Sequence, residues 1–405
     1  MRILEGKSIT AVQGIKASGI TAGIKKSGRK DVCVVYSEKE AVGAAVFTTN
    51  RVKAAPLLLD MENIKNETIR AVVVNSGNAN ACTGKDGYEN AVKMGEVVAA
   101  HFGVDPKEVI VQSTGVIGVQ LPMDKVIPGV EEACKAVSAD GGHDAAEAIM
   151  TTDLFAKEIV IEIEVDGKPV TIAGMAKGSG MIHPNMATML GTVVTDINIT
   201  KAMLEKAFKG SVDDSYNMIS VDGDTSTNDM AVVMANGMAG NKIIDSENED
   251  FMKFKAALDY LNKELAKLIA VDGEGATKLL EVNVVNAKDI KSAKLAAKSV
   301  ITSSLTKCAF FGEDANWGRI LCAVGYSEAD FDPEKIDIFL RANGLSVQVA
   351  ENGRGMVFDE LLAADVLKEK EITVFIDMKM GEAEATAWGC DLSYKYVEIN
   401  GAYRT

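Results

Sequence analysis

Short apolar runs of strand length recur along this chain without forming a regular strand–helix–strand repeat. Residues 191–195 are one such run, and residues 87–102 have the three-and-four spacing of a helix. Four more runs, separated by Gly, Asn and Asp, lie at 32–36, 71–75, 109–113 and 159–165. A doubly wound parallel sheet would require strands and helices to alternate, so the pattern predicts a layered α+β fold instead.

The second half of the chain begins with its clearest predicted helix, at 249–269. Ser246 and Glu249 predict a capping box at its start. A strand at 279–285 and a helix at 288–304 are expected to follow. The apolar residues of the 249–269 helix recur every three or four positions: Phe251, Phe254, Leu258, Leu261, Leu265 and Leu268. The C-terminal stretch contains four predicted strands, at 336–340, 372–378, 383–390 and 394–399.

Length and charge limit the classes of function. A chain of 405 residues is long for one core, so we expect two domains or one large layered domain. The chain contains 43 Lys and Arg residues and 58 Asp and Glu residues, which gives a formal net charge of −15. Basic pairs occur only at Lys25-Lys26 and Arg29-Lys30, which argues against a nucleic-acid partner. An anionic substrate would need a local cation, because the overall field repels it.

Cysteine and histidine usage limits the kinds of site that the chain can contain. No stretch approaches the ~18 apolar residues of a membrane span, and the N-terminus has no signal-peptide core. Six scattered cysteines without a C-x-x-C pair are typical of reduced thiols in a cytoplasmic protein. The histidines, His101, His143 and His183, have no partners at ligand spacing, so neither a His-based zinc site nor a Ser-His-Asp triad is expected.

A glycine-rich segment at 174–191, GMAKGSGMIHPNMATMLG, is the best candidate for a site. Its glycines allow backbone turns that other residues avoid. The segment does not match a phosphate-binding loop, because Lys177 lacks the preceding glycine spacing and the strand-to-helix setting. Small residues, Ala187 and Thr188, precede the predicted strand at 191–195. Judged by its residues alone, the segment fits a surface loop and a functional site equally well.

The motif HPNMATML within this segment resembles the self-cleavage motif of the ornithine acetyltransferase family, the glutamate N-acetyltransferases of arginine biosynthesis. The resemblance extends over essentially the whole chain. Further segments agree in the same order: VVNSGNANACTG (73–84), VQSTGVIG (111–118), MTTDLFAK (150–157), VDGDTSTND (221–229), VDGEGATK (271–278), FFGEDANWGRI (310–320) and EINGAYRT (398–405).

The resemblance implies a layered αββα sandwich with N-terminal-nucleophile chemistry. Cleavage between Ala187 and Thr188 would give two intertwined fragments, an alpha fragment of residues 1–187 and a beta fragment of residues 188–405. Thr188 would attack the carbonyl of Ala187, and hydrolysis of the ester would free its α-amine. An α-amine with an ordinary pKa near ~8 can act as the base without any histidine. The family also implies a heterotetramer of two alpha and two beta fragments.

The resemblance also implies roles for particular residues. Thr188 would be the nucleophile, and the Thr114 hydroxyl with the Gly115 N–H would form the oxyanion hole. Lys177 would supply positive charge to substrate carboxylates, and Glu274 would pair with an amine. The full set implied to bind substrate is Thr151, Lys177, Thr188, Glu274, Asn400 and Thr405.

The implied reaction is a ping-pong acetyl transfer through Thr188, from N-acetylornithine to glutamate. No cofactor is implied, although some family members also use acetyl-coenzyme A as an acetyl donor. Two alternatives stay open: an aminopeptidase or amidase of the same fold that passes the acyl group to water, and a non-catalytic protein that keeps only the fold. We interpret 221–229 and 312–320 as structural hydrogen-bond networks; the alternative is a metal at Asp222, Asp224 and Asp229.

Overall fold

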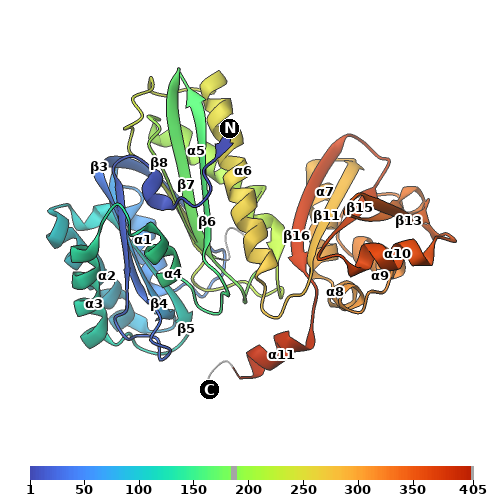
Figure 1. The fold of residues 1–405 in the computed structure, drawn as a ribbon, viewed down its shortest axis with the longest axis horizontal. Coiled ribbons are helices and arrows are strands. Elements are labelled where there is room, and N and C mark those ends of the chain that lie inside the picture. Colours follow the sequence, from blue (N-terminus) through green and yellow to red (C-terminus); the bar gives the residue numbers. More distant parts are fainter. Residues whose placement is uncertain (184–188, 403–405) are drawn as a thin grey trace. The chain divides into compact units, whose positions relative to one another are not determined.

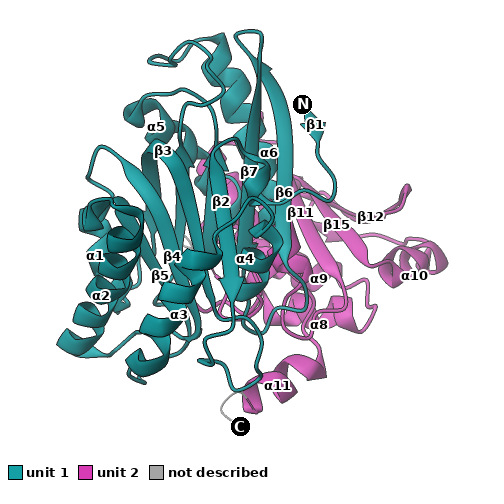
Figure 2. Cartoon of the chain, turned by 60° about the vertical axis from the view of Figure 1, so that its left-hand side comes forward, with its two compact units in different colours: residues 1–178, 184–217, 225–265 teal, residues 179–183, 218–224, 266–405 magenta. Residues whose placement is uncertain are grey.

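The computed structural model of the chain describes residues 1–183 and 189–402 (Figure 1). It divides into two compact units (Figure 2). Unit 1 comprises residues 1–178, 184–217 and 225–265, and unit 2 comprises residues 179–183, 218–224 and 266–405. Unit 1 therefore contains strands from both sides of the predicted cleavage position.

Within the described residues of unit 1, one nine-stranded sheet has the order β1-β6-β7-β8-β10-β3-β4-β5, with β2 paired to β3. The strands are β1 (Arg2–Ile3), β2 (Ile15–Ile20), β3 (Val32–Phe47), β4 (Ile69–Asn78), β5 (Val109–Val116), β6 (Lys157–Val165), β7 (Lys168–Lys177), β8 (Leu190–Thr195) and β10 (Met230–Ala235). The helices are α1 (Ala55–Asn63), α2 (Gly84–Phe102), α3 (Met123–Ala136), α4 (Gly142–Ala148), α5 (Lys201–Asp213) and α6 (Glu249–Val271), the last of which continues into unit 2.

The long strand β3 joins two halves of this sheet, because its first part pairs with β2 and β4 and its last part pairs with β10. Val32 and Val34 pack in the core formed with α2 and α3. The alternate residues, Cys33 and Val35, pack in the core shared with β6, β7, β8 and β10. Side chains of consecutive strand residues point to opposite faces, so β3 supplies both cores.

A helix also covers the outer face of the second half of the sheet. Leu261 and Leu265 of α6 lie directly over Gly174 of β7. The layers are therefore α2 and α3, the β2–β5 half, the β6–β8 and β10 half, and α6. The predicted αββα sandwich is confirmed.

Unit 2 contains a mixed seven-stranded sheet in the order β14-β13-β12-β15-β11-β16-β9. Helix α7 packs on β11 and β16. The strands are β9 (Ile219–Ser220), β11 (Leu279–Ala287), β12 (Asp337–Ala342), β13 (Leu345–Glu351), β14 (Arg354–Gly355), β15 (Glu371–Asp377) and β16 (Ala383–Cys390). The helices are α7 (Ile290–Thr302), α8 (Ser304–Phe311), α9 (Trp317–Gly325), α10 (Glu360–Lys368) and α11 (Tyr394–Gly401).

Two sequence predictions are wrong. Residues 394–399 were expected to form a strand and instead belong to helix α11, whose start is capped by the Ser393 hydroxyl accepting from Lys395 N. The start of α6 is not a capping box of Ser246 and Glu249. Asn248 caps it, because its Oδ1 accepts from Phe251 N at 2.9 Å. A helix cap is a single hydrogen bond that a backbone N–H donates to a side chain, so any of several neighbouring polar residues can form it.

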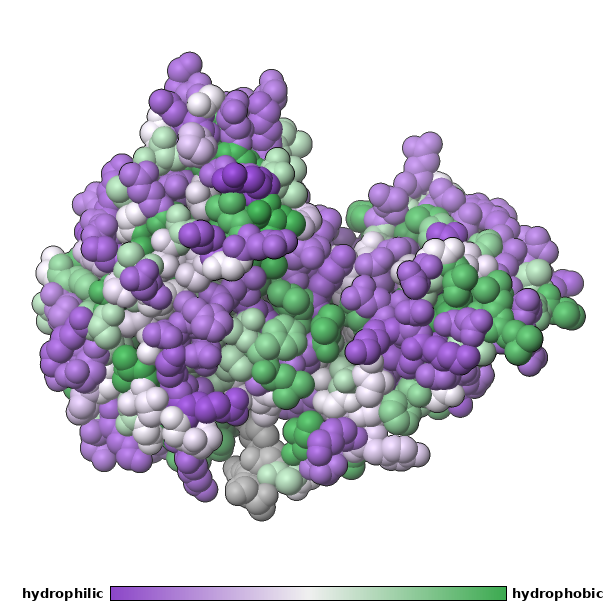
Figure 3. Space-filling model, in the orientation of Figure 1, coloured by the Kyte–Doolittle hydropathy of each residue, from purple (hydrophilic) through white to green (hydrophobic). Residues whose placement is uncertain are grey.

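The surface shown in Figure 3 is mostly hydrophilic over both units. Unit 2 also exposes apolar side chains, among them Met356 and Val357 shortly before α10 and Leu361 within it. Across residues 1–183 and 189–402, no helix combines the length and apolar character needed to cross a membrane.

Candidate active site

Strand ends bring together three of the predicted site residues in unit 1. Thr114 and Gly115 lie at the end of β5, and Lys177 is the last residue of β7. The Lys177 ammonium donates to the Thr114 hydroxyl oxygen at 3.4 Å. Lys177 also pairs with Leu190, the first residue of β8, so this cluster lies beside the chain that follows Thr188 in sequence. Thr188, Ala187 and Thr405 themselves lie outside the described residues.

Gly115 has a backbone that only glycine tolerates. Its φ is +134°, and it lies opposite Gly77 of the parallel strand β4. A Cβ at Gly115 would lie 2.3 Å from the carbonyl carbon of Gly77 and 2.5 Å from Asn78 N. Because these atoms are backbone, they cannot move aside as a flexible side chain would. Glycine at position 115 is therefore required for the close approach of β4 and β5.

The contact between Lys177 and Thr114 gives the hydroxyl a defined polarity. Both side chains are buried, with 7% and 9% of their surface exposed. An ammonium can only donate, so the Thr114 oxygen accepts and its hydrogen must point away from Lys177. A hydroxyl held in this way can donate to a negative charge that develops next to it, which is the task of an oxyanion hole.

Asp153 ties this cluster to the predicted substrate residue Thr151. One carboxylate oxygen accepts from Thr151 N at 2.8 Å, and the other accepts from Gly178 N and the Lys157 ammonium, both at 2.8 Å. Burial raises the pKa of Asp153, but the ammonium groups of Lys177 and Lys157 outweigh it and hold this pKa well below its usual range. Asp153 is therefore ionised, and it fixes the backbone on both sides of the cluster.

The Asp153–Lys157 ion pair has no exposed surface, so breaking it should be costly. Lys157→Met should lower the free energy of unfolding by about 3–5 kcal/mol, because it removes one partner of the buried pair. Lys93→Met is the matched control, since Lys93 and Glu96 form an exposed pair worth about 0–1 kcal/mol. Both Trp residues lie in unit 2, so urea unfolding of unit 1 is best followed by circular dichroism. Equal losses in the two variants would contradict the prediction.

A further lysine adds positive charge near the predicted oxyanion-hole residues. Burial lowers the pKa of Lys25 to about 8; Asp31 opposes this shift, whereas Arg29 and Lys177 add to it. The Lys25 ammonium donates to the main-chain oxygens of Lys30 at 2.6 Å and Ala148 at 3.4 Å. The acidic protein thus contains a local cluster of cations, as an anionic substrate would require.

Glu274 and Asn400 are brought together within unit 2. Asn400 Nδ2 donates to Glu274 Oε2 at 2.7 Å, and the Glu274 side chain is buried. Glu274 N donates to Ser179 O at 2.9 Å. A Cβ at Gly180 would lie 2.4 Å from the Glu274 carboxylate. The carboxylate therefore packs directly against the glycine-rich segment, whereas its role in binding an amine stays a prediction.

His183 lies next to Ser220, which precedes the segment 221–229 with its three aspartates. The His183 Nδ1 lies 3.2 Å from the Ser220 hydroxyl. Burial, helped by Lys298 and opposed by Asp222, lowers the pKa of His183 to about 4, so the ring is neutral at neutral pH. The described part of the chain contains no group of three or more His, Cys, Asp or Glu arranged to hold a metal ion. Asp222, Asp224 and Asp229, the alternative ligands considered from the sequence, do not form such a group.

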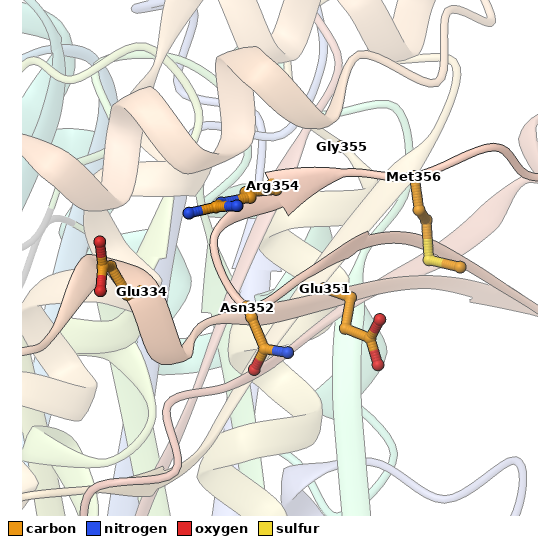
Figure 4. A pocket seen from close by; sticks show the side chains of 6 residues that line it. All are labelled: Glu334, Glu351, Asn352, Arg354, Gly355 and Met356. Atoms are coloured by element: carbon orange, nitrogen blue, oxygen red, sulfur yellow. The ribbon is translucent and has the colours of Figure 1, made fainter.

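A pocket of about 350 Å³ lies at the β13–β14 hairpin of unit 2 (Figure 4). It contains none of the predicted site residues. Its lining residues are all exposed: Glu334, Glu351, Asn352, Arg354, Gly355 and Met356. It is therefore a recess of the surface, without the buried polar groups that a binding site needs to fix a ligand.

Sequence reasoning missed Asp153, Lys157 and Lys25. The first two lie in the segment MTTDLFAK, whose resemblance was noted only as a whole. Their separation by four residues is a spacing at which opposite charges can pair, and it could have identified them. Nothing in the local sequence of Lys25 indicates that its side chain is partly buried.

The chain is similar to known proteins over nearly its whole length. The sequence profile of the ArgJ family matches residues 16–405. The "Arginine biosynthesis bifunctional protein ArgJ" of Caldanaerobacter subterraneus subsp. tengcongensis is 60% identical over 405 residues, covering 100% of both chains. The "ArgJ 1" protein of Clostridium acetobutylicum is 55% identical, covering 100% of this chain and 99% of its own. The crystal structure of ArgJ from Bacillus halodurans is 43% identical, with a TM-score of 0.50, and covers 53% of this chain and 100% of its own.

Proposed function

The chain belongs to the ArgJ family, and from that membership we propose that it transfers the acetyl group of N-acetylornithine to glutamate, giving ornithine and N-acetylglutamate. The relatives are named for arginine biosynthesis. One structural observation supports the proposal most strongly: the Lys177 ammonium donates to the Thr114 hydroxyl. Lys177 is the last residue of β7 and pairs with Leu190, the first residue of β8. Acyl transfer needs such a buried, oriented donor beside its nucleophile.

The enzyme first cuts its own chain. The Thr188 hydroxyl attacks the carbonyl carbon of Ala187, the peptide C–N bond breaks, and the nitrogen takes the hydroxyl proton. Water then hydrolyses the ester, leaving a carboxylate on Ala187 and both an amine and a hydroxyl on Thr188. Cleavage is supported by the Bacillus halodurans relative, whose whole chain covers 53% of this one. Residues 188–405 make up a similar share of the 405 residues of this chain.

The mature enzyme then works in two half-reactions. The α-amine of Thr188 takes the proton of its hydroxyl, and the oxygen attacks the acetyl carbon of N-acetylornithine. The oxyanion receives hydrogen bonds from Thr114 and Gly115, and ornithine leaves with the proton on its amine. In the second half-reaction the amine of glutamate attacks the acetyl-Thr188 ester and restores the free hydroxyl.

Substrate recognition follows from the charges of the site. Lys177 pairs with a substrate carboxylate, because the protein otherwise carries an excess of negative charge. Glu274, supported by Asn400, pairs with the substrate amine. Thr151, Thr188 and Thr405 complete the proposed set.

A second activity is favoured by the name "bifunctional" that the relatives share. Acetyl-coenzyme A would acetylate the same Thr188, and glutamate would again accept the group, so no further cofactor is needed. We also infer a cytoplasmic heterotetramer of two alpha and two beta fragments.

Intact-mass analysis tests the acetyl-enzyme. Incubation with N-acetylornithine alone should add one acetyl group to the fragment that begins at Thr188, because no acceptor amine is present to remove it. Glutamate should then discharge the ester and yield N-acetylglutamate. A fragment that is discharged equally fast in buffer without glutamate would point to an amidase. A protein that is never acetylated would rule out the proposed intermediate.

A further inference from the structure

The turn at 220–224 binds the chain just before the predicted cleavage position. One carboxylate oxygen of Asp222 accepts a hydrogen bond from Met181 N at 2.6 Å, and the other accepts one from Ile182 N at 2.9 Å. Val221 N and the Ser220 hydroxyl donate to Ile182 O at 2.7 and 3.2 Å. All of these residues belong to unit 2. Both polar groups of the Ile182 backbone are thus satisfied by one short turn.

Met181 adopts an unfavourable backbone in this arrangement. Its φ is +56°, in the left-handed region, although it is not glycine. The Met181 side chain is 43% exposed, so packing does little to impose this conformation. Two consecutive N–H groups that converge on one carboxylate can hold such a bend. The Asp222 carboxylate is therefore the contact that holds the backbone of Met181 in this conformation.

The chain after the cleavage position is held in a similar way in unit 1. Met189 O accepts from Met230 N at 2.9 Å, and Leu190 continues as β8 between β7 and β10. Of the two anchors, Asp222 lies in the conspicuous segment 221–229 and Met230 directly follows it. A hydroxyl that attacks its own chain needs the two reacting atoms to be held in a defined geometry.

We propose that Asp222 is a positioning residue for self-cleavage: its carboxylate holds the backbone of Met181 and Ile182 so that the chain reaches Ala187 in the orientation that Thr188 attacks. This inference rests on the proposed cleavage between Ala187 and Thr188. It gives the segment 221–229 a function in maturation, separate from binding of substrate. Its partners among the described residues are the N–H groups of Met181, Ile182 and Asp224 and the Tyr396 hydroxyl, so its proposed role is to position the chain.

The test compares Asp222→Asn with Asp224→Asn in the full-length chain. The asparagine offers only one acceptor oxygen and turns an NH₂ group toward a backbone N–H, so cleavage should slow by roughly 10–100-fold. Asp224 contributes its main-chain N–H to the turn, at 3.2 Å from Asp222, so its variant removes a charge and keeps the contact. The rate is measured by following uncut chain in freshly translated protein on denaturing gels. Once cut, the Asp222→Asn enzyme should keep kcat and KM within about threefold of the wild type.

Several outcomes would overturn the proposal. Wild-type cleavage of Asp222→Asn, equal slowing in both variants, or a loss of kcat in the cut Asp222→Asn enzyme would each do so. Asp222→Glu keeps a carboxylate and should cut faster than Asp222→Asn; a Glu variant that is no faster would contradict a hydrogen-bonding role even if the Asn variant folds poorly. An uncut wild-type chain would instead refute the proposed cleavage, so the two failures are distinguishable.

Discussion

Thr188→Ala should leave the protein as one uncut and inactive chain of 405 residues. Without the hydroxyl no ester can form at Ala187, and no free amine and nucleophile are created. The wild type should instead give two pieces on a denaturing gel, residues 1–187 and 188–405, and N-terminal sequencing of the larger should read Thr-Met-Leu-Gly. Activity is measured as ornithine released from N-acetylornithine in the presence of glutamate.

Thr188→Ser is the matched control for this experiment. It keeps a hydroxyl at the same position, so it should still cut, more slowly than the wild type, and recover activity as it does. An intact wild-type chain with full activity would contradict the N-terminal-nucleophile mechanism. So would an active Thr188→Ala protein, because no other residue is proposed to carry the acetyl group.

The strands of unit 1 could be predicted from the sequence because both faces of its central strands are buried. Strand β3 begins with Val32–Val35, which supplies the core with α2 and α3 and the core between the sheet halves. Such strands are apolar throughout and end at Gly, Asn or Asp, which makes them visible. Helix α11 was misread because Tyr394 and Tyr396 alternate with Lys395 as strand residues do, and it buries no side chain among its described residues.

The arrangement of the site could not be predicted from spacing. Thr114 and Lys177 are 63 positions apart, and they meet only because β5 and β7 both pack in the core between the two halves of the sheet. The resemblance identified these residues individually. Only the folded structure shows that they contact each other and that the Asp153 carboxylate binds the backbone beside them.

Thr114→Ala should lower kcat by roughly 10²–10³ and change KM much less. The structure gives the reason: Lys177 donates to the Thr114 oxygen at 3.4 Å, which directs the hydroxyl hydrogen away from the ammonium. A donor of this kind strengthens its hydrogen bond as the carbonyl becomes an oxyanion, so its loss affects the transition state more than the bound substrate. Steady-state kinetics with N-acetylornithine and glutamate provide the measurement.

Cleavage must be checked before this rate is interpreted, because the same hydroxyl can stabilise the oxyanion formed at Ala187. Intact mass gives the fraction of cut chain, and kcat is then expressed per cut molecule. Thr114→Ser keeps the hydroxyl and loses only a methyl group, so it should stay within about tenfold of the wild type. If Thr114→Ala raised KM and left kcat unchanged, Thr114 would bind substrate instead of stabilising the transition state, and the oxyanion would depend on Gly115 and other donors.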